Sequence, residues 1–150
     1  RQPRANETNG REYYFMSLKE FQDKIAKEAF IEYEQVYENQ YYGTLKSEVE
    51  RIEAINCSVV FDVDVEGGLK IKQHFGNNLL AVFIRPPSIE NLRERLIARN
   101  TETAESLEIR LNKSIKELSY ENRFDNIIIN DYFEQSCIKA ETLVNAFLSR

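Results

Sequence analysis

The 150-residue sequence predicts an α/β fold, and two of its patterns carry this prediction. After about residue 45, short apolar runs of the kind found in buried parallel strands alternate with segments of helical period. Before residue 45, one segment alternates apolar and polar side chains, which is typical of an antiparallel strand with one face in water. We therefore expect a parallel sheet core flanked by helices, with a small antiparallel subdomain on one side.

The first third of the chain supplies the elements of that subdomain. Ser17 and Glu20 have the spacing of a capping box, which predicts a helix that begins there and ends near Lys27. The other predicted elements of this part are a short aromatic strand at 13–15, an alternating strand at 30–36, a turn before Tyr41 and Tyr42, and a helix at about 45–54.

The rest of the chain alternates strands and helices. Residues 57–61 read Cys-Ser-Val-Val-Phe, a continuous run that predicts a strand inside a parallel sheet, and Asp62 follows it directly. The remaining predicted elements are helices at about 65–75, 88–99, 103–120 and 132–148 and strands at 79–84 and 126–129.

Charge and composition exclude several classes of protein. The chain has 20 Lys+Arg against 25 Asp+Glu and no basic run, which argues against nonspecific binding to nucleic acid or to a membrane. No apolar run approaches the ~20 residues of a membrane span, so we expect a cytoplasmic protein. Cys57 and Cys137 have no Cys or His at metal-binding spacing and are expected to be reduced thiols in the core. His74, the single histidine, is expected on a partly exposed helix, so a Ser/His/Asp triad is excluded.

Two aspartates mark a first candidate site. Asp62 and Asp64 lie two residues apart at the carboxyl end of the predicted strand, so both carboxylates would share the face where α/β proteins bind ligands. The alternative is that they cap the next helix, whose first turn favours negative charge. Gly67 and Gly68 lie inside that helix, where each glycine costs about 1 kcal/mol relative to alanine, which indicates a close approach to the backbone. The sequence leaves both interpretations open.

Arginines after residue 88 form a second candidate site. Arg95 and Arg99 lie one helical turn apart without an acidic partner on their own helix, and Arg110 on the next helix also lacks one. Like charges one turn apart repel, unless an external anion lies between them. Forked guanidinium donors match phosphate oxygens, so the three side chains suit a phosphate clamp. The alternative is a solvated helix face.

A third cluster combines residues from the start of the chain with a later pair. Arg1, Arg4 and Tyr13, together with Tyr42 and Thr44, offer guanidinium and hydroxyl donors for a phosphomonoester. Whether they converge depends on the tertiary structure.

The order of these clusters resembles that of the guanylate kinases, which transfer a phosphoryl group from ATP to GMP. The resemblance covers nearly the whole chain, because many short motifs occur in register. They are R-x-P-R-x-x-E-x-x-G-x-x-Y-x-F at 1–15, Phe30-Ile-Glu-Tyr33, Tyr41-Tyr-Gly-Thr44, Asp62-Val-Asp64-Val-Glu-Gly67, Pro86-Pro-Ser88, Arg95-Leu, Arg99, Thr101-Glu-Thr103, Arg110-Leu and Asn130-Asp131.

This resemblance implies an architecture and a set of roles. The core would be P-loop-kinase-like at about 45–88 and 121–150, with a GMP-binding subdomain at about 1–44 and a helical lid with flanking helices at about 89–120. Guanine presents N1–H and N2–H₂ donors, which ionised carboxylates can accept. The implied contacts are Arg1, Arg4, Tyr13 and Tyr42 with the GMP phosphate, Glu32, Thr44 and Asp64 with guanine, Arg95, Arg99 and Arg110 with the ATP phosphates, Arg99 and Asn130 with adenine, and Asp62 near Mg²⁺ and its waters.

The sequence also departs from the family pattern. The Walker A motif G-x-x-x-x-G-K-[ST] does not occur in the 150 residues, and in the family it would stand just before Arg1. We therefore expect the chain by itself to form no GDP. Smaller departures are Glu66 in place of the usual Gln, Asn100 in place of Gly and Tyr132 in place of a second Asp.

A second function stays open. Guanylate-kinase-like domains of scaffolding proteins have lost ATP chemistry and bind phosphorylated peptides at the old GMP site. Such domains tend to lose the lid arginines, so the presence of Arg95, Arg99, Arg110 and Asn130 favours the enzyme.

Overall fold

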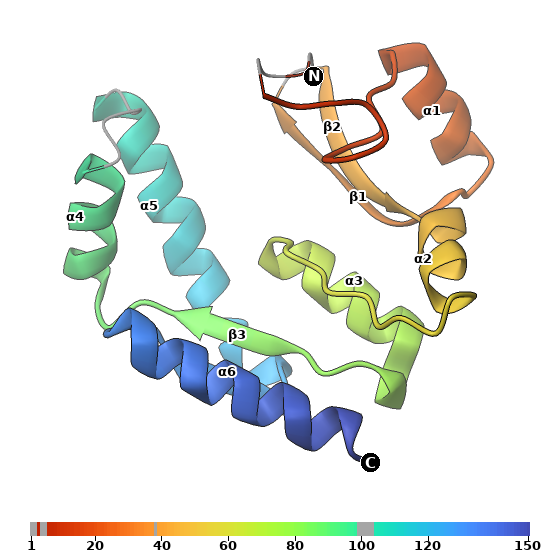
Figure 1. Ribbon diagram of the computed structural model, residues 1–150. Coiled ribbons are helices and arrows are strands. Elements are labelled where there is room, and N and C mark those ends of the chain that lie inside the picture. Colours follow the sequence, from red (N-terminus) through yellow and green to blue (C-terminus); the bar gives the residue numbers. More distant parts are fainter. Residues whose placement is uncertain (1–2, 4–5, 38, 99–103) are drawn as a thin grey trace. The chain divides into compact units, whose positions relative to one another are not determined.

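The computed structural model describes residues 3, 6–37, 39–98 and 104–150, whose elements are shown in Figure 1. The chain divides into two units, residues 1–74 and 75–150. One sheet of two strands, β1 and β2, lies in the first unit, and another, β3 and β4, lies in the second. Along the chain, helices precede and follow both strand pairs, which confirms the predicted α/β class.

The first unit begins with a helix that the sequence predicts closely. In α1 (Leu18–Ala26), the Ser17 hydroxyl accepts a hydrogen bond from the Glu20 N–H at 3.2 Å, and the Glu20 carboxylate accepts one from the Ser17 N–H at 2.7 Å. This is the predicted capping box, and its hydrogen bonds lower the pKa of Glu20. The helix buries Phe21, which stacks on Phe30 with 4.4 Å between ring centroids.

The predicted antiparallel subdomain is present as a hairpin. Strand β1 (Phe30–Tyr37) pairs antiparallel with β2 (Gln40–Leu45), so that Glu32 lies opposite Thr44 and Tyr33 lies opposite Gly43. A Cβ atom on Gly43 would lie only 2.8 Å from the Glu32 carbonyl oxygen, so a side chain does not fit there. Helix α2 (Lys46–Glu53) follows β2 directly, as the sequence predicts.

Two strands predicted for the first unit do not form among the described residues. In the aromatic run 13–15, only Tyr13 makes an isolated bridge, to Asn9. Residues 57–61 adopt no regular structure, and Val60 is 91% exposed. An apolar run forms a strand only where a neighbouring strand completes its hydrogen bonds, and the described strands of this unit pair only with each other.

The cysteine prediction is correct in one respect and wrong in another. Cys57 and Cys137 are both free thiols, but both are exposed. Cys57 lies in the run that forms no strand, and Cys137 lies in the last helix of the chain, which is described below. His74 is exposed in the last turn of α3 (Val65–Phe75), as predicted for a surface histidine.

The second unit contains a parallel strand pair. After the short 3₁₀ turn η1 (Gly76–Asn78), β3 (Val82–Arg85) pairs in parallel with β4 (Asn126–Ile129). Strand β3 begins later than the predicted residue 79, because residues 79–81 follow the 3₁₀ turn without regular structure. The Ala81 N–H is also taken by the Asp125 carboxylate at 2.8 Å, so it is not available for a strand hydrogen bond.

Two helices of the second unit form a hairpin. Helices α4 (Ile89–Ala98) and α5 (Ala104–Leu118) lie side by side in Figure 1 and bury a cluster of leucines, Leu96, Leu107 and Leu111. Helix α5 is followed by the 3₁₀ turn η2 (Glu121–Arg123).

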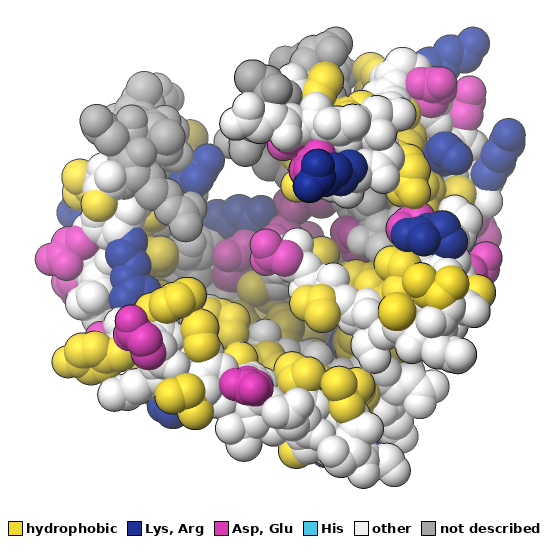
Figure 2. Space-filling view, viewed as in Figure 1, with side chains coloured by type: hydrophobic (Ala, Val, Ile, Leu, Met, Phe, Trp, Pro, Cys, Tyr) yellow, Lys and Arg dark blue, Asp and Glu magenta, His cyan; other side chains and the backbone are white. Residues whose placement is uncertain are grey.

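The last helix of the chain, α6 (Phe133–Leu148), keeps its apolar side chains accessible. It contains no fully buried residue, and Phe133, Ile138 and Leu148 are exposed. Figure 2 shows hydrophobic side chains over the region that α6 occupies in Figure 1. No helix among the described residues is long and apolar enough to cross a lipid bilayer.

Candidate functional site

A buried carboxylate on β1 is the centre of the candidate site in the first unit. Glu32 is 8% exposed, and it is the one buried polar or charged side chain within the described residues. Its Oε1 accepts a hydrogen bond from the Thr44 hydroxyl at 2.7 Å, because the strand register places the two residues opposite each other. No donor within the described residues bonds its Oε2. A buried carboxylate oxygen without a donor is unfavourable, so this atom is suited to a ligand that donates a hydrogen bond.

A second carboxylate lies beside the first. Asp64 precedes α3, and its Oδ1 accepts the Gly67 N–H at 2.8 Å. A Cβ atom on Gly67 would lie 3.1 Å from Asp64 Oδ1 and 3.3 Å from Glu32 Oε2. Asp64 therefore caps the helix, as one interpretation predicts, and its carboxylate also lies next to that of Glu32. Its role in binding a ligand stays a prediction. The close approach predicted at Gly67 is confirmed.

Asp62 differs from Asp64. The prediction that period-two geometry puts both aspartates on one face is wrong, because residues 57–64 form no strand. Asp62 is exposed.

Two tyrosines of the third cluster come together. The rings of Tyr13 and Tyr42 meet edge to face with 6.1 Å between centroids. The neighbouring Tyr14 donates its hydroxyl to Glu48 on α2 at 3.0 Å, and the Arg51 guanidinium binds the same carboxylate. This contact, which links the segment that carries Tyr13 to α2, was not predicted, since no local pattern signals a bond between residues 34 positions apart. Arg1 and Arg4 lie outside the described residues.

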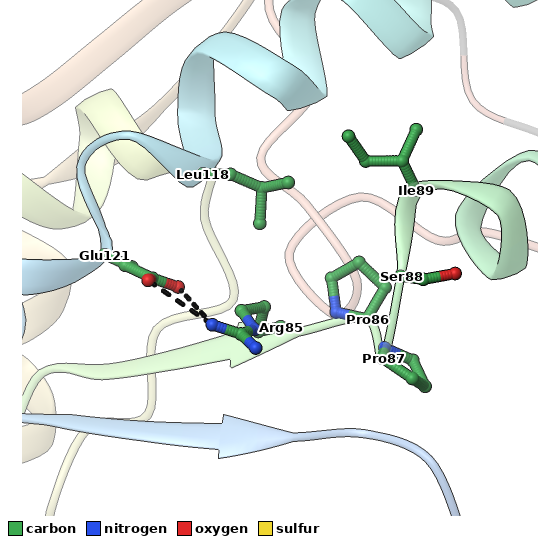
Figure 3. Close-up of a pocket in the computed structure, with 7 residues that line it drawn as sticks. All are labelled: Arg85, Pro86, Pro87, Ser88, Ile89, Leu118 and Glu121. Carbon is green, nitrogen blue, oxygen red and sulfur yellow. Dashed lines mark hydrogen bonds and ion pairs between the residues drawn. The ribbon is translucent and has the colours of Figure 1, made fainter.

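In the second unit, polar groups gather at the carboxyl ends of β3 and β4. Figure 3 shows the Arg85 guanidinium directed at the Glu121 carboxylate, and the two form an ion pair of 3.2 Å. The backbone N–H of Asn130 donates to the Arg85 carbonyl at 2.7 Å, and the Arg95 guanidinium reaches the Asp131 carbonyl at 3.5 Å. The fold thus brings Arg95 to Asp131, the residue that follows Asn130 after β4. Open α/β sheets bind ligands at this edge.

A small pocket opens beside this ion pair. It has a volume of about 180 Å³ and is lined by Arg85, Pro86, Pro87, Ser88, Ile89, Leu118 and Glu121 (Figure 3). The sequence did not predict the pairing of Arg85 with Glu121, because these residues come from separate elements.

The arginines of the helical hairpin have different surroundings. Arg93 on α4 pairs with Glu108 on α5 at 3.1 Å, which is a surface contact between the two helices. Arg95 and Arg110 are half-buried, so neither belongs to a fully solvated face. Arg99 lies outside the described residues.

Comparisons with known proteins identify the family. The family model described as guanylate kinase matches residues 1–147. The chain belongs to the guanylate kinase family. The resemblance in the motifs is therefore confirmed over nearly the whole chain.

Curated relatives and a solved structure agree with the family model. A guanylate kinase of Bacteroides fragilis is 48% identical over 148 residues, which are 99% of this chain and 72% of that protein. A guanylate kinase of Porphyromonas gingivalis is 52% identical over 131 residues, which are 87% of this chain and 70% of that protein. A crystal structure of guanylate kinase from Anaplasma phagocytophilum has a TM-score of 0.76 at 25% identity and covers 97% of this chain and 70% of that one.

These relatives bear on two expectations from the sequence. Their names describe enzymes, so they give no support to the phosphopeptide-binding alternative. They equally give no support to the expectation that the chain is inactive by itself.

Proposed function

We propose that the protein phosphorylates GMP with ATP as the phosphoryl donor, forming GDP and ADP. The observation that carries this proposal is the buried carboxylate of Glu32, whose Oε2 has no donor within the described residues and which lies beside Asp64. Membership of the guanylate kinase family supports the same reaction.

The carboxylate pair favours guanine over adenine. Guanine presents N1–H and N2–H₂ as neighbouring donors, and ionised Glu32 and Asp64 can only accept. Adenine presents an acceptor lone pair at N1, which would face a carboxylate and leave it without a donor. An unmade hydrogen bond of a buried group costs about 1–3 kcal/mol, so the site discriminates strongly between the two bases. Thr44 contributes by holding Glu32 Oε1.

The GMP phosphate is assigned to the two tyrosines and the first arginines. The edge-to-face contact of the Tyr13 and Tyr42 rings brings these two side chains together, which supports a shared role at the phosphate. Arg1 and Arg4 would add forked, charge-assisted donors.

The second unit is assigned to ATP. We place α4 and α5 in a lid, in which Arg95, Arg99 and Arg110 bind phosphate oxygens, and we assign Asn130 together with Arg99 to adenine. The contact of Arg95 with the Asp131 carbonyl supports this grouping, because Asp131 directly follows Asn130 in the chain. In phosphoryl transfer such groups act by positioning the reactants and by stabilising charge on the equatorial oxygens.

Mg²⁺ would enter with ATP. Magnesium is usually held by one or two carboxylates, several waters and the substrate phosphates. Asp62 is an exposed carboxylate and fits such a water-mediated role, and the described residues contain no group of three or more side chains able to hold a metal alone. When bound, the ion neutralises charge on the β- and γ-phosphates.

The subdivision of the chain follows from these assignments. We propose a GMP-binding part at about 1–44, a core at about 45–88 and 121–150, and the lid with its flanking helices at about 89–120. A cytoplasmic location and the absence of a nucleic acid partner stay predictions.

Two measurements test the function. Calorimetry should show that the protein binds GMP and that AMP binds at least about tenfold more weakly, as one missing hydrogen bond to a buried charge requires. A coupled assay with GMP and Mg·ATP then measures GDP formation. Equal affinity for GMP and AMP would refute the proposal. Binding of a phosphorylated peptide in place of GMP would support the alternative module.

A further inference from the structure

We propose that Gly67 is a positioning residue, which sets the spacing of the Glu32 and Asp64 carboxylates and thereby the preference for a base with a 2-amino group. This inference rests on the proposed GMP site and adds a determinant of specificity to it. Gly67 acts through the two carboxylates rather than on the reacting phosphates.

The absence of a side chain at residue 67 leaves room for both carboxylates. A Cβ atom there would lie 3.1 Å from Asp64 Oδ1 and 3.3 Å from Glu32 Oε2. Both separations are tighter than the 3.4–4 Å of ordinary van der Waals contact for a Cβ atom. A third neighbour, Val63 Cβ, would also stand at 3.3 Å, so the methyl group would be crowded by the Val63 side chain as well as by the two carboxylates.

Neither carboxylate can move away freely. Glu32 is 8% exposed, lies within a paired strand and is held by the Thr44 hydroxyl at 2.7 Å. Asp64 is held by the Gly67 N–H itself at 2.8 Å. A methyl group at residue 67 would therefore shift an anchored oxygen by a few tenths of an ångström and misalign its hydrogen bonds.

The backbone gives no other reason for glycine at this position. The described glycines with positive φ are Gly10 and Gly76, whereas Gly67 lies in the first turn of α3. Alanine suits a helical backbone better than glycine does, so local propensity favours the substitution. The close neighbours of residue 67, which are the two carboxylates and Val63, are what remains to explain glycine here.

The spacing matters most for a base that offers two adjacent donors. Guanine can give N1–H to one carboxylate and N2–H₂ to the other, whereas hypoxanthine, the base of IMP, keeps N1–H and lacks the amino group. Moving the carboxylates should thus weaken the binding of GMP more than that of IMP.

The test compares the protein with Gly67→Ala and with a control, Gln73→Ala, at an exposed position of the same helix. Calorimetry gives the Kd of GMP, IMP and ATP, and thermal unfolding gives the Tm. We expect Gly67→Ala to raise the Kd of GMP at least about tenfold, the effect of one lost hydrogen bond to a charged group. The Kd of ATP and the Tm should be maintained, and the ratio of the IMP and GMP dissociation constants should fall. The Gln73→Ala control should resemble the wild type in every measurement.

The outcomes separate this inference from the proposed function. Wild-type protein that binds no GMP overturns both. Wild-type protein that prefers GMP, together with a Gly67→Ala variant of unchanged GMP affinity and unchanged preference over IMP, overturns only the role of Gly67.

A second variant keeps the test decisive if alanine lowers the Tm. Glu32→Asp shortens the side chain by one methylene and withdraws its oxygens from residue 67. In that background, Gly67→Ala should weaken GMP binding by a smaller factor than in the wild type, because the close contact with the residue 32 carboxylate is relieved. Equal factors in the two backgrounds would overturn the proposal.

Discussion

Replacing Glu32 by glutamine should weaken GMP binding and leave the fold at least as stable. The Thr44 hydroxyl, 2.7 Å from Oε1 in the wild type, can donate equally well to the amide oxygen of glutamine. The amide NH₂ then takes the place of Oε2, so a donor faces the guanine donors. Losing one hydrogen bond to a charged group costs about 1.5–3 kcal/mol, which corresponds to a rise in the Kd of GMP of about 10- to 150-fold.

The effect on stability should have the opposite sign. Glu32 is a buried charge, 8% exposed, with one neutral hydroxyl as its donor within the described residues. Burying a charge with so few partners is unfavourable, and glutamine removes that charge while keeping the hydrogen bond to Thr44. The Tm of the unliganded variant should therefore equal or exceed that of the wild type. Such opposite effects mark a residue whose burial serves binding rather than folding.

Calorimetry with GMP and ATP, together with thermal unfolding, measures both effects. Glu50→Gln, which changes an exposed carboxylate on α2 in the same way, is the matched control and should alter neither quantity. Wild-type affinity for GMP in Glu32→Gln would refute this reasoning. An equal loss of GMP and ATP binding would refute it as well, because it would show general damage in place of a lost guanine contact.

Three further predictions concern the lid, the first helix and pH. Arg99→Ala should lower kcat by orders of magnitude with little change in the Kd of GMP, since we assign this guanidinium to stabilising the charge that develops during phosphoryl transfer. A large rise in the Kd of GMP would contradict the assignment. Ser17→Ala removes the N-cap of α1 and should lower the free energy of unfolding by about 1 kcal/mol, measured by denaturant titration, and an unchanged value would contradict the role of the cap. The Arg51 guanidinium holds the pKa of Glu48 below its ordinary value of 4.5, so this contact stabilises the folded state above that pH. The stabilisation is lost as the pH falls through the lowered pKa of Glu48. The Tm difference between the wild type and Glu48→Gln should therefore shrink in acid, and a difference that stays constant with pH would refute this role of the contact.

Local patterns in the sequence predicted most of the helices and the antiparallel hairpin. The capping box at Ser17, the alternation at 30–36 and the helical period at 65–75 depend on neighbours within a few residues, so the sequence alone determines them. The motifs in register also identified the family, which the family model confirms over residues 1–147. Gly67 signalled a close approach, because a glycine inside a helix is unfavourable without a reason.

What the sequence could not decide depends on partners far away in the chain. The apolar run 57–61 looks like a buried strand, yet strand formation requires a neighbour, and Val60 is 91% exposed. The same limit concealed the ion pair of Arg85 with Glu121, 36 positions apart. Only the tertiary structure showed that Glu32 is buried, that Thr44 lies opposite it and that Asp64 joins it across Gly67. A site of this kind is set by distances between elements, and such distances leave no trace in local sequence.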